Sequence, residues 1–160
     1  MAKNADGADT TEDPAAASTG VNSDALPDGP LLFYDGGCAL CHRAVRLLLR
    51  WERPGSLPGS GLRFAPLDGT LADCLRADGT LPLERDAVTF VADGDVTQAE
   101  AAIRSALRAV GRPGLAAFLG LWPTPLRHWG YRTVAANRTR WFGRTEAACP
   151  LPEDSQRFLL

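Results

Sequence analysis

The chain has 160 residues, of which 45% are hydrophobic and 22% are charged, and its net charge is −2 at pH 7. This length and balance fit one globular domain that buries a core of its own. No apolar run approaches the roughly 20 residues that a membrane-spanning helix needs. Residues 1–29 also lack the basic start and apolar centre of a signal peptide, so we expect a cytoplasmic protein.

Residues 1–29 are rich in Ala, Asp, Ser, Thr, Gly and Pro and contain no aromatic residue. A segment of this composition cannot bury enough apolar surface to offset the entropy lost on folding. We therefore predict a disordered acidic tail before the folded part of the chain.

The first predicted strand, residues 31–34, is a short apolar run that ends at the turn signal Asp35-Gly36-Gly37. Residues 39–51 contain few helix breakers and carry apolar side chains at helical spacing. The strand therefore leads into a helix, and the pair Cys38 and Cys41 falls at the start of that helix.

The rest of the chain alternates between strand and helix patterns, which predicts a mixed α/β sheet covered by helices. A proline-broken extension follows this core. The predicted elements are a strand at 62–67, a helix at 71–77, a strand at 87–92 that turns at Asp93-Gly94 into a strand around Val96, a helix at 99–110, an apolar segment at 115–122 and a helix from about 126 to 136.

The spacing of Cys38 and Cys41 places both sulfurs on one face of the helix, where they can form a disulfide. Cys38 lies at the helix N-terminus, where unpaired amides and the helix dipole favour a thiolate, whereas Cys41 lies one turn deeper and faces the apolar side. We therefore predict that Cys38 attacks a substrate disulfide and that Cys41 resolves the mixed disulfide. Four cysteines in a chain without an export signal favour redox or metal chemistry over structural disulfides.

Residues next to the cysteines have predicted supporting roles. We expect Asp35 to cap the helix, and the alternative is that it transfers a proton for Cys41. Gly36 and Gly37 are expected to permit a sharp turn and a close approach of substrate backbone. His42 is expected to be a partly exposed helix residue.

Asp35, Cys38 and Cys41 form an Asp-x-x-Cys-x-x-Cys motif after a strand, and this motif resembles that of the DCC family of thiol-disulfide oxidoreductases. The segment from Tyr131 to Arg144, followed by Cys149-Pro150, resembles the C-terminal signature of the same family. That family is similar to thioredoxins in fold. The resemblance implies an α/β, thioredoxin-like mixed sheet flanked by helices, with a C-terminal helical extension, and dithiol–disulfide exchange.

The resemblance also sets the expected domain bounds: a thioredoxin-like domain at 30–150, its helical extension at about 113–145, and a C-terminal tail at 151–160. Thioredoxins carry a cis-proline just before the third core strand, but Ala87 precedes Val88 here, so we expect substrate docking at Ala87 to differ. The family pattern includes four further residues whose role the resemblance does not define: Asn137, Arg138, Arg140 and Gly143.

The expected partners are a disulfide-containing protein or a small-molecule thiol, with no cofactor and no defined electron donor. Residues 101–145 contain eight Lys or Arg and no Asp or Glu, and they are rich in aromatic side chains. We expect these aromatic residues to cover the core. A substrate platform and a membrane contact are the alternatives, and we expect no nucleic-acid binding because no recognised binding module accompanies the basic stretch.

Parts of the sequence are compatible with three other kinds of function. The first is a non-catalytic interaction domain that uses the Trp- and Arg-rich extension. The second is a zinc site at Cys38, Cys41, Cys74 or Cys149, but the second ligand pair of a structural zinc site is missing, and Cys74 reads as a small packing residue. The third is c-type haem at Cys38-Ala39-Leu40-Cys41-His42, which the cytoplasmic expectation opposes. We expect no bound metal.

Overall fold

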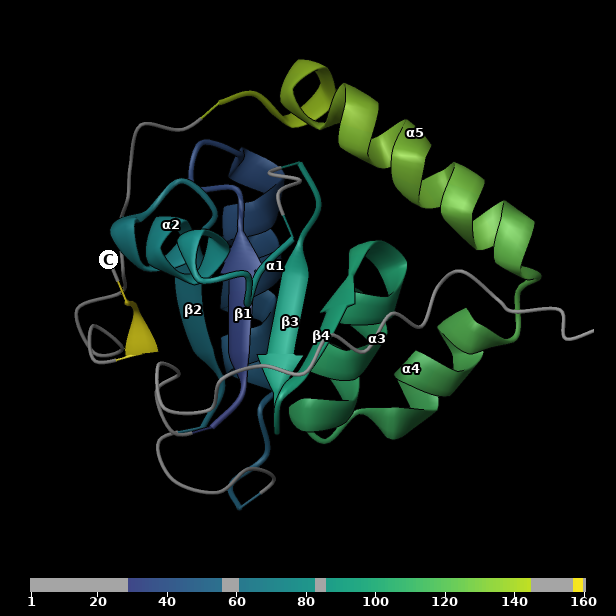
Figure 1. Ribbon diagram of the computed structural model, residues 1–160. Coiled ribbons are helices and arrows are strands. Elements are labelled where there is room, and N and C mark those ends of the chain that lie inside the picture. The colour runs from purple at the N-terminus through teal and green to yellow at the C-terminus, as the bar shows by residue number, and fades with distance from the viewer. Residues whose placement is uncertain (1–28, 56–60, 83–85, 145–156, 160) are drawn as a thin grey trace, which may run out of the picture.

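The computed structural model describes residues 29–55, 61–82, 86–144 and 157–159. Strands and helices alternate through the core and two helices follow it (Figure 1). In chain order the elements are β1 (Leu31–Tyr34), α1 (Ala39–Trp51), β2 (Arg63–Pro66), α2 (Thr70–Ala77), β3 (Thr89–Ala92), β4 (Asp95–Gln98), α3 (Ala99–Ala109), α4 (Pro113–Gly120) and α5 (Thr124–Phe142).

The four strands form one mixed sheet in the order β2-β1-β3-β4. β1 pairs with β2 in parallel and with β3 antiparallel, so that Leu32 lies opposite both Phe64 and Phe90. β3 and β4 form the predicted hairpin, whose turn residues Asp93 and Gly94 have positive φ angles of 52° and 83°. Positive φ at both central positions is typical of a tight type I′ turn, which matches the twist of the two strands.

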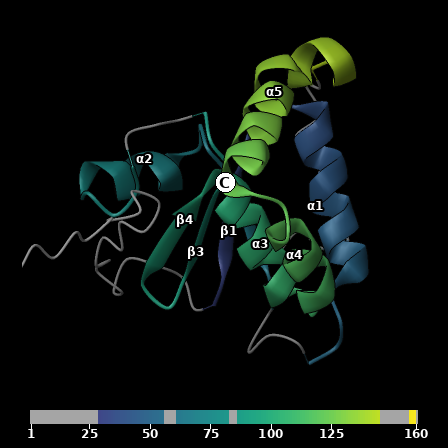
Figure 2. The same ribbon diagram turned by 90° about the vertical axis from the view of Figure 1, so that its right-hand side faces the viewer.

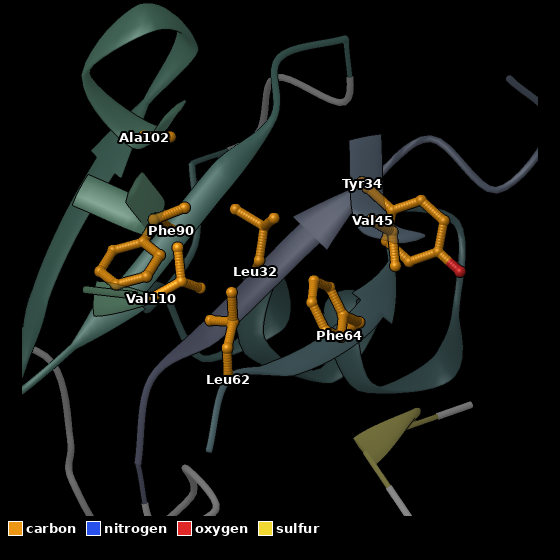
Figure 3. Close-up of a cluster of buried hydrophobic side chains, with 9 residues drawn as sticks. Leu32, Tyr34, Val45, Leu62, Phe64, Phe90, Ala102 and Val110 are labelled. Carbon is orange, nitrogen blue, oxygen red and sulfur yellow. The ribbon is translucent and has the colours of Figure 1, made fainter. Parts of the chain in front are cut away.

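Side chains of β1 alternate between two buried faces of the sheet. Leu32 and Tyr34 lie in a cluster with residues of α1 and α3, as Figure 3 shows, whereas Leu31 and Phe33 pack with residues of α2. Figure 2 shows α2 on one side of the sheet and α1 and α3 on the other. Because both faces are covered, β1 is a continuous apolar run rather than an alternating one.

The thioredoxin-like α/β fold predicted from the sequence is confirmed, with α4 and α5 as the C-terminal extension. The last helix is longer than the predicted 126–136 and runs from Thr124 to Phe142. It has Pro125 in its first turn, where a missing N–H costs nothing, and it ends at Gly143 with a positive φ. None of its residues is fully buried.

The expectation that the aromatic residues of the extension cover the core is wrong. Trp122 and Trp129 are 51% and 66% exposed, and Tyr131 alone among the predicted aromatic set is partly buried. No helix in the described ranges is both long enough and apolar enough to span a bilayer. The other exposed large apolar residues of the extension are Leu115, Phe118, Leu119, Leu121, Leu126, Val134, Trp141 and Phe142.

Residues 157–159 return to the domain beside β2. The ring of Phe158 stacks on that of Phe64 with centroids 5.6 Å apart, and the Leu159 N–H donates to the Phe64 carbonyl at 2.9 Å. This part of the predicted C-terminal tail is therefore in contact with the core. The predicted tail at 1–29 lies outside the described residues, apart from Gly29.

Candidate active site

The turn between β1 and α1 carries the cysteine motif, and Asp35 closes this turn. The Asp35 carbonyl accepts the Cys38 N–H at 3.2 Å, and its Oδ1 accepts the Gly37 N–H at 2.9 Å. The expectation that Asp35 caps α1 is therefore wrong, because the N-cap of α1 is Cys38. A short carboxylate that accepts an amide two residues ahead forms an Asx turn, which competes with capping for the same oxygen.

Cys38 itself is the N-cap of α1, because its sulfur accepts the Cys41 N–H at 3.4 Å. A sulfur in this position faces the amide ends of the first helical turn, at the positive end of the helix dipole. The side chain is fully buried, with 0% of its surface exposed. The sequence predicts the position of Cys38 at the helix N-terminus but does not predict that its side chain is buried.

Cys41 is partly buried and packs against the core cluster of α1, α3 and the sheet. Burial, a hydrogen bond with Cys38 and the negative charge of Cys38 raise the pKa of Cys41 to about 12, with Asp35 adding to the rise and Arg138 opposing it. The Cys41 thiol therefore holds its proton at neutral pH. Its position one turn deeper, on the apolar side of α1, agrees with the sequence prediction.

Arg138 of α5 reaches the cysteine motif from the opposite end of the domain sequence. One of its terminal nitrogens (NH2) lies 2.8 Å from Asp35 Oδ2, and the two side chains are 15% and 28% exposed. The ion pair joins the Asp-x-x-Cys-x-x-Cys motif to the second predicted family segment. No spacing rule could have found this contact, because the two residues meet only after α5 crosses the end of α1.

Gly143 and Arg144, here called the strap, lie along the backbone of Cys38 and Ala39. Arg144 forms an isolated antiparallel bridge with Cys38, and the Gly143 carbonyl accepts the Ala39 N–H at 3.4 Å. In Figure 1 the C-terminal end of α5 leads into this segment close to the start of α1. The strap is therefore held against the backbone at the start of α1, next to Cys38.

Tyr131 of α5 contacts the backbone of Val88, directly after Ala87, where the sequence predicts that docking differs. Its hydroxyl oxygen accepts the Val88 N–H at 3.2 Å, and Thr89 Oγ1 donates to the Ala87 carbonyl at 3.2 Å. The described part of the chain contains no cis peptide bond. The Val88 amide, directly after Ala87, is therefore engaged by the extension, which no sequence signal indicated.

His42 is a partly exposed residue of α1, as predicted, and it also contacts the turn before the helix. His42 Nε2 lies 2.7 Å from the Gly36 carbonyl oxygen, and its ring packs edge-on against Tyr34, so that it ties the turn to α1. Gly36 and Gly37 do not have positive φ angles, so the turn does not use the backbone freedom that is specific to glycine. A Cβ at Gly36 would lie 3.4 Å from atoms of Asp68 and Pro66, which is van der Waals contact.

The other predicted residues lie farther from the sulfurs. Asn137 Nδ2 donates to the Thr133 carbonyl within α5, and Arg140 is exposed. Cys74 lies on α2, on the opposite face of the sheet from the cysteine pair, and its exposure contradicts the predicted packing role. Cys149 lies outside the described residues.

An apolar cavity of about 410 Å³ opens beside Cys41 between α1, α3, α4 and α5. The ionisable side chains that line this cavity are Tyr34, Cys41, Tyr131 and Arg138. A volume of this size is in the range of small-molecule sites. Apolar wall residues include Leu48, Ile103, Ala106, Leu119 and Val134.

Within the ranges that the structure describes, no three His, Cys, Asp or Glu side chains gather closely enough to hold a metal ion. Cys38 and Cys41 have Asp35 and Arg138 as their charged neighbours.

Comparison with known proteins agrees with the motif. The model of the DCC1-like thiol-disulfide oxidoreductase family matches residues 32–144. The uncharacterized protein YuxK of Bacillus subtilis (strain 168) is 32% identical over 142 residues, which cover 87% of this chain and 99% of that protein. No solved structure matches the chain significantly. The matched range begins in β1 and ends at the strap, so it includes the cysteine motif, Arg138 and Gly143.

Proposed function

Because this chain belongs to the DCC1-like thiol-disulfide oxidoreductase family, we propose that it exchanges its own dithiol with substrate disulfides, with Cys38 attacking and Cys41 resolving. The observation that carries the proposal is the position of the Cys38 sulfur, 3.4 Å from the Cys41 amide at the first turn of α1. This contact supports a thiolate at Cys38, while the pKa of about 12 supports a protonated thiol at Cys41.

The proposed reaction has two exchange steps. The Cys38 thiolate attacks one sulfur of the substrate disulfide, forms a mixed disulfide and releases the first substrate thiolate. Cys41 then loses its proton and attacks the Cys38 sulfur, which releases the second substrate thiolate and leaves a Cys38-Cys41 disulfide. Two electrons pass from the cysteine pair to the substrate, and both released thiolates take up protons. A low-molecular-weight or protein thiol returns the pair to the reduced state.

Attack requires access to Cys38, which is fully buried. The strap is held against the start of α1 by one backbone bridge to Cys38 and one N–H···O contact of 3.4 Å with Ala39. These contacts are few and weak compared with the core, so the strap can separate from Cys38 without unfolding of the sheet. We place this local opening before the first exchange step.

The test is exposure of the reduced protein to glutathione disulfide, followed by mass spectrometry of each cysteine peptide. We expect the wild type to form the Cys38-Cys41 disulfide and release two glutathione molecules. Cys41→Ser should stop at the mixed disulfide, with glutathione held on Cys38, and Cys38→Ser should leave Cys41 unmodified. Cys74→Ser is the matched control, because Cys74 is exposed on the far face of the sheet. Glutathione on Cys41 in place of Cys38 would reverse the assigned roles.

A second candidate is an interaction domain that uses the exposed apolar side chains of the extension. The observation in its favour is the exposure of Leu121, Trp122 and Trp129, which are 82%, 51% and 66% exposed. Biological activity that survives Cys38→Ser and is lost in a Trp122→Ala, Trp129→Ala double variant would favour this candidate over the exchange reaction.

A further inference from the structure

Arg138 is held on α5 so that its guanidinium lies at the cysteine pair. Its ion pair with Asp35 is 2.8 Å long and partly buried, so it is screened less than an exposed pair. The cavity beside Cys41 is lined by Arg138 on its α5 side, so one guanidinium contacts both the Asp35 carboxylate and the surroundings of the thiol. The ordinary structural use of such a pair would be to hold α5 against the turn.

We propose that Arg138 is a positioning residue of the redox site: it balances the charge of the Asp35 carboxylate beside the cysteine pair, so that Cys41 can release its proton when it resolves the mixed disulfide. This role rests on the proposed function, because only the exchange reaction requires Cys41 to release its proton. The charge balance at Cys41 can be measured without any turnover.

The charges that surround Cys41 act in opposite directions. Arg138 favours the thiolate, whereas the charges of Asp35 and of Cys38 disfavour it, and burial adds the largest cost. The other ionisable groups that face Cys41 are the hydroxyls of Tyr34 on β1 and Tyr131 on α5, which are neutral because burial raises the pKa of each. Arg138 is therefore the cation that offsets the negative charge at this thiol.

This arrangement predicts opposite effects for the two partners of the ion pair. Arg138→Gln removes the cation and leaves the Asp35 charge unbalanced, so Cys41 should become harder to ionise. Asp35→Asn keeps the shape and removes the anion, so Cys41 should become easier to ionise. When both charges are removed together, the two effects should largely cancel, because they come from one pair.

The charge balance between Arg138 and Asp35 matters in the resolving step. Cys41 must pass its proton to solvent before its sulfur can attack the Cys38 sulfur of the mixed disulfide and expel the substrate thiolate. A negative charge without a partner would oppose the formation of a second negative charge at Cys41. Arg138 removes that opposition at the moment when the Cys41 thiolate forms.

The experiment measures the rate at which iodoacetamide, a neutral reagent, alkylates Cys41 in the reduced full-length chain, with each cysteine peptide quantified by mass spectrometry. At about pH 8.5 the rate follows the small thiolate fraction, and one pKa unit changes that fraction about tenfold. We expect Arg138→Gln to slow Cys41 alkylation roughly three- to tenfold and Asp35→Asn to accelerate it by a similar factor. Arg138→Lys, which keeps the charge, should remain close to the wild type. The double variant should stay within about twofold of it, because the two charge effects cancel.

The direction of the change in alkylation rate distinguishes charge balance by Arg138 from simple support of α5. If Arg138 only holds α5 in place, Arg138→Gln opens the site and accelerates Cys38 and Cys41 together, which would overturn the proposal. An unchanged Cys41 rate in Arg138→Gln would overturn it as well. Arg132→Gln, an exposed arginine of the same helix, is the matched control and should leave both rates unchanged.

The isosteric Asp35→Asn variant tests the proposal by itself if Arg138→Gln does not fold, because it must accelerate Cys41. Failure of the proposed function has a different result: the wild type would then not form the Cys38-Cys41 disulfide with glutathione disulfide, whatever the signs of the alkylation changes. A normal exchange reaction with the wrong signs would overturn the role of Arg138 alone.

Discussion

Replacement of Gly143 by alanine should uncover Cys38. Gly143 has φ 78° and ψ 174°, a region that is essentially restricted to glycine. No atom lies within 4 Å of the position that a Cβ would take, so the substitution causes no clash and its cost is confined to the backbone. That cost is about 1–3 kcal/mol for an L-residue in this region.

The strain should release the strap rather than unfold the domain. The Gly143 carbonyl makes a single long contact of 3.4 Å with the Ala39 N–H, and a hydrogen bond contributes only about 0.5–1.5 kcal/mol net. A strain of similar or larger size shifts the strap toward the open form, in which the chain relaxes to an ordinary φ. Because 1.4 kcal/mol corresponds to a tenfold change, alkylation of Cys38 should rise by about 5- to 150-fold.

The assay is iodoacetamide labelling under native conditions, with Cys74 as an exposed internal reference for the reagent. Gly130→Ala is the matched control, because Gly130 lies inside α5, has no positive φ and also has open space around its missing Cβ. If Cys38 reacts at the wild-type rate in Gly143→Ala, the strap is not what protects it. An equal acceleration in Gly130→Ala would mean that access depends on a general opening of α5.

Two further predictions follow from groups around the site. The raised pKa of Cys41, from 9.0 to about 12, means that the folded state holds this proton more tightly than the unfolded state does, so the associated stability is present below pH 9 and is lost as the pH rises toward 12. Urea unfolding of the reduced protein at two pH values should therefore show that wild type loses stability relative to Cys41→Ser as the pH is raised above 9, and a constant difference would contradict this shift. Tyr131→Phe removes the acceptor of the Val88 N–H and should lower the unfolding free energy by about 1 kcal/mol while leaving the spectroscopic fold intact. Hydrogen exchange at the Val88 amide should become faster in this variant, and unchanged exchange would show that the hydroxyl does not protect it.

Local sequence patterns predicted the part of the fold that local physics decides. The apolar run 31–34, the turn at Asp35 and the helical spacing after Cys38 gave the bounds of α1 correctly, because strand burial and helix propensity act over a few residues. The hairpin at Asp93-Gly94 is of the same kind, since two residues with positive φ specify that turn. The order of these elements then predicted the sheet, and the cysteine pair follows the carboxyl end of its interior strand β1.

The behaviour of the extension depended on tertiary contacts. Trp122 and Trp129 are large aromatic residues of a kind that is often buried. The helices α4 and α5 lie along the outside of the domain, however, and leave both side chains exposed. The sequence of this segment does not show how much core surface the other elements leave uncovered. Aromatic residues alone therefore could not predict whether this segment covers the core or presents an apolar surface.

The cysteine pair and its unequal positions on α1 were determined by the sequence itself, because a helix of fixed pitch places residues three apart on one face and gives its first turn free amides. The charge and access of the pair were decided only by the tertiary structure. Arg138 and the strap reach Asp35 and Cys38 across about a hundred residues of chain, and α5 brings them there as one rigid helix. Contacts of this kind depend on the packing of whole elements, whose direction in space no short-range pattern encodes.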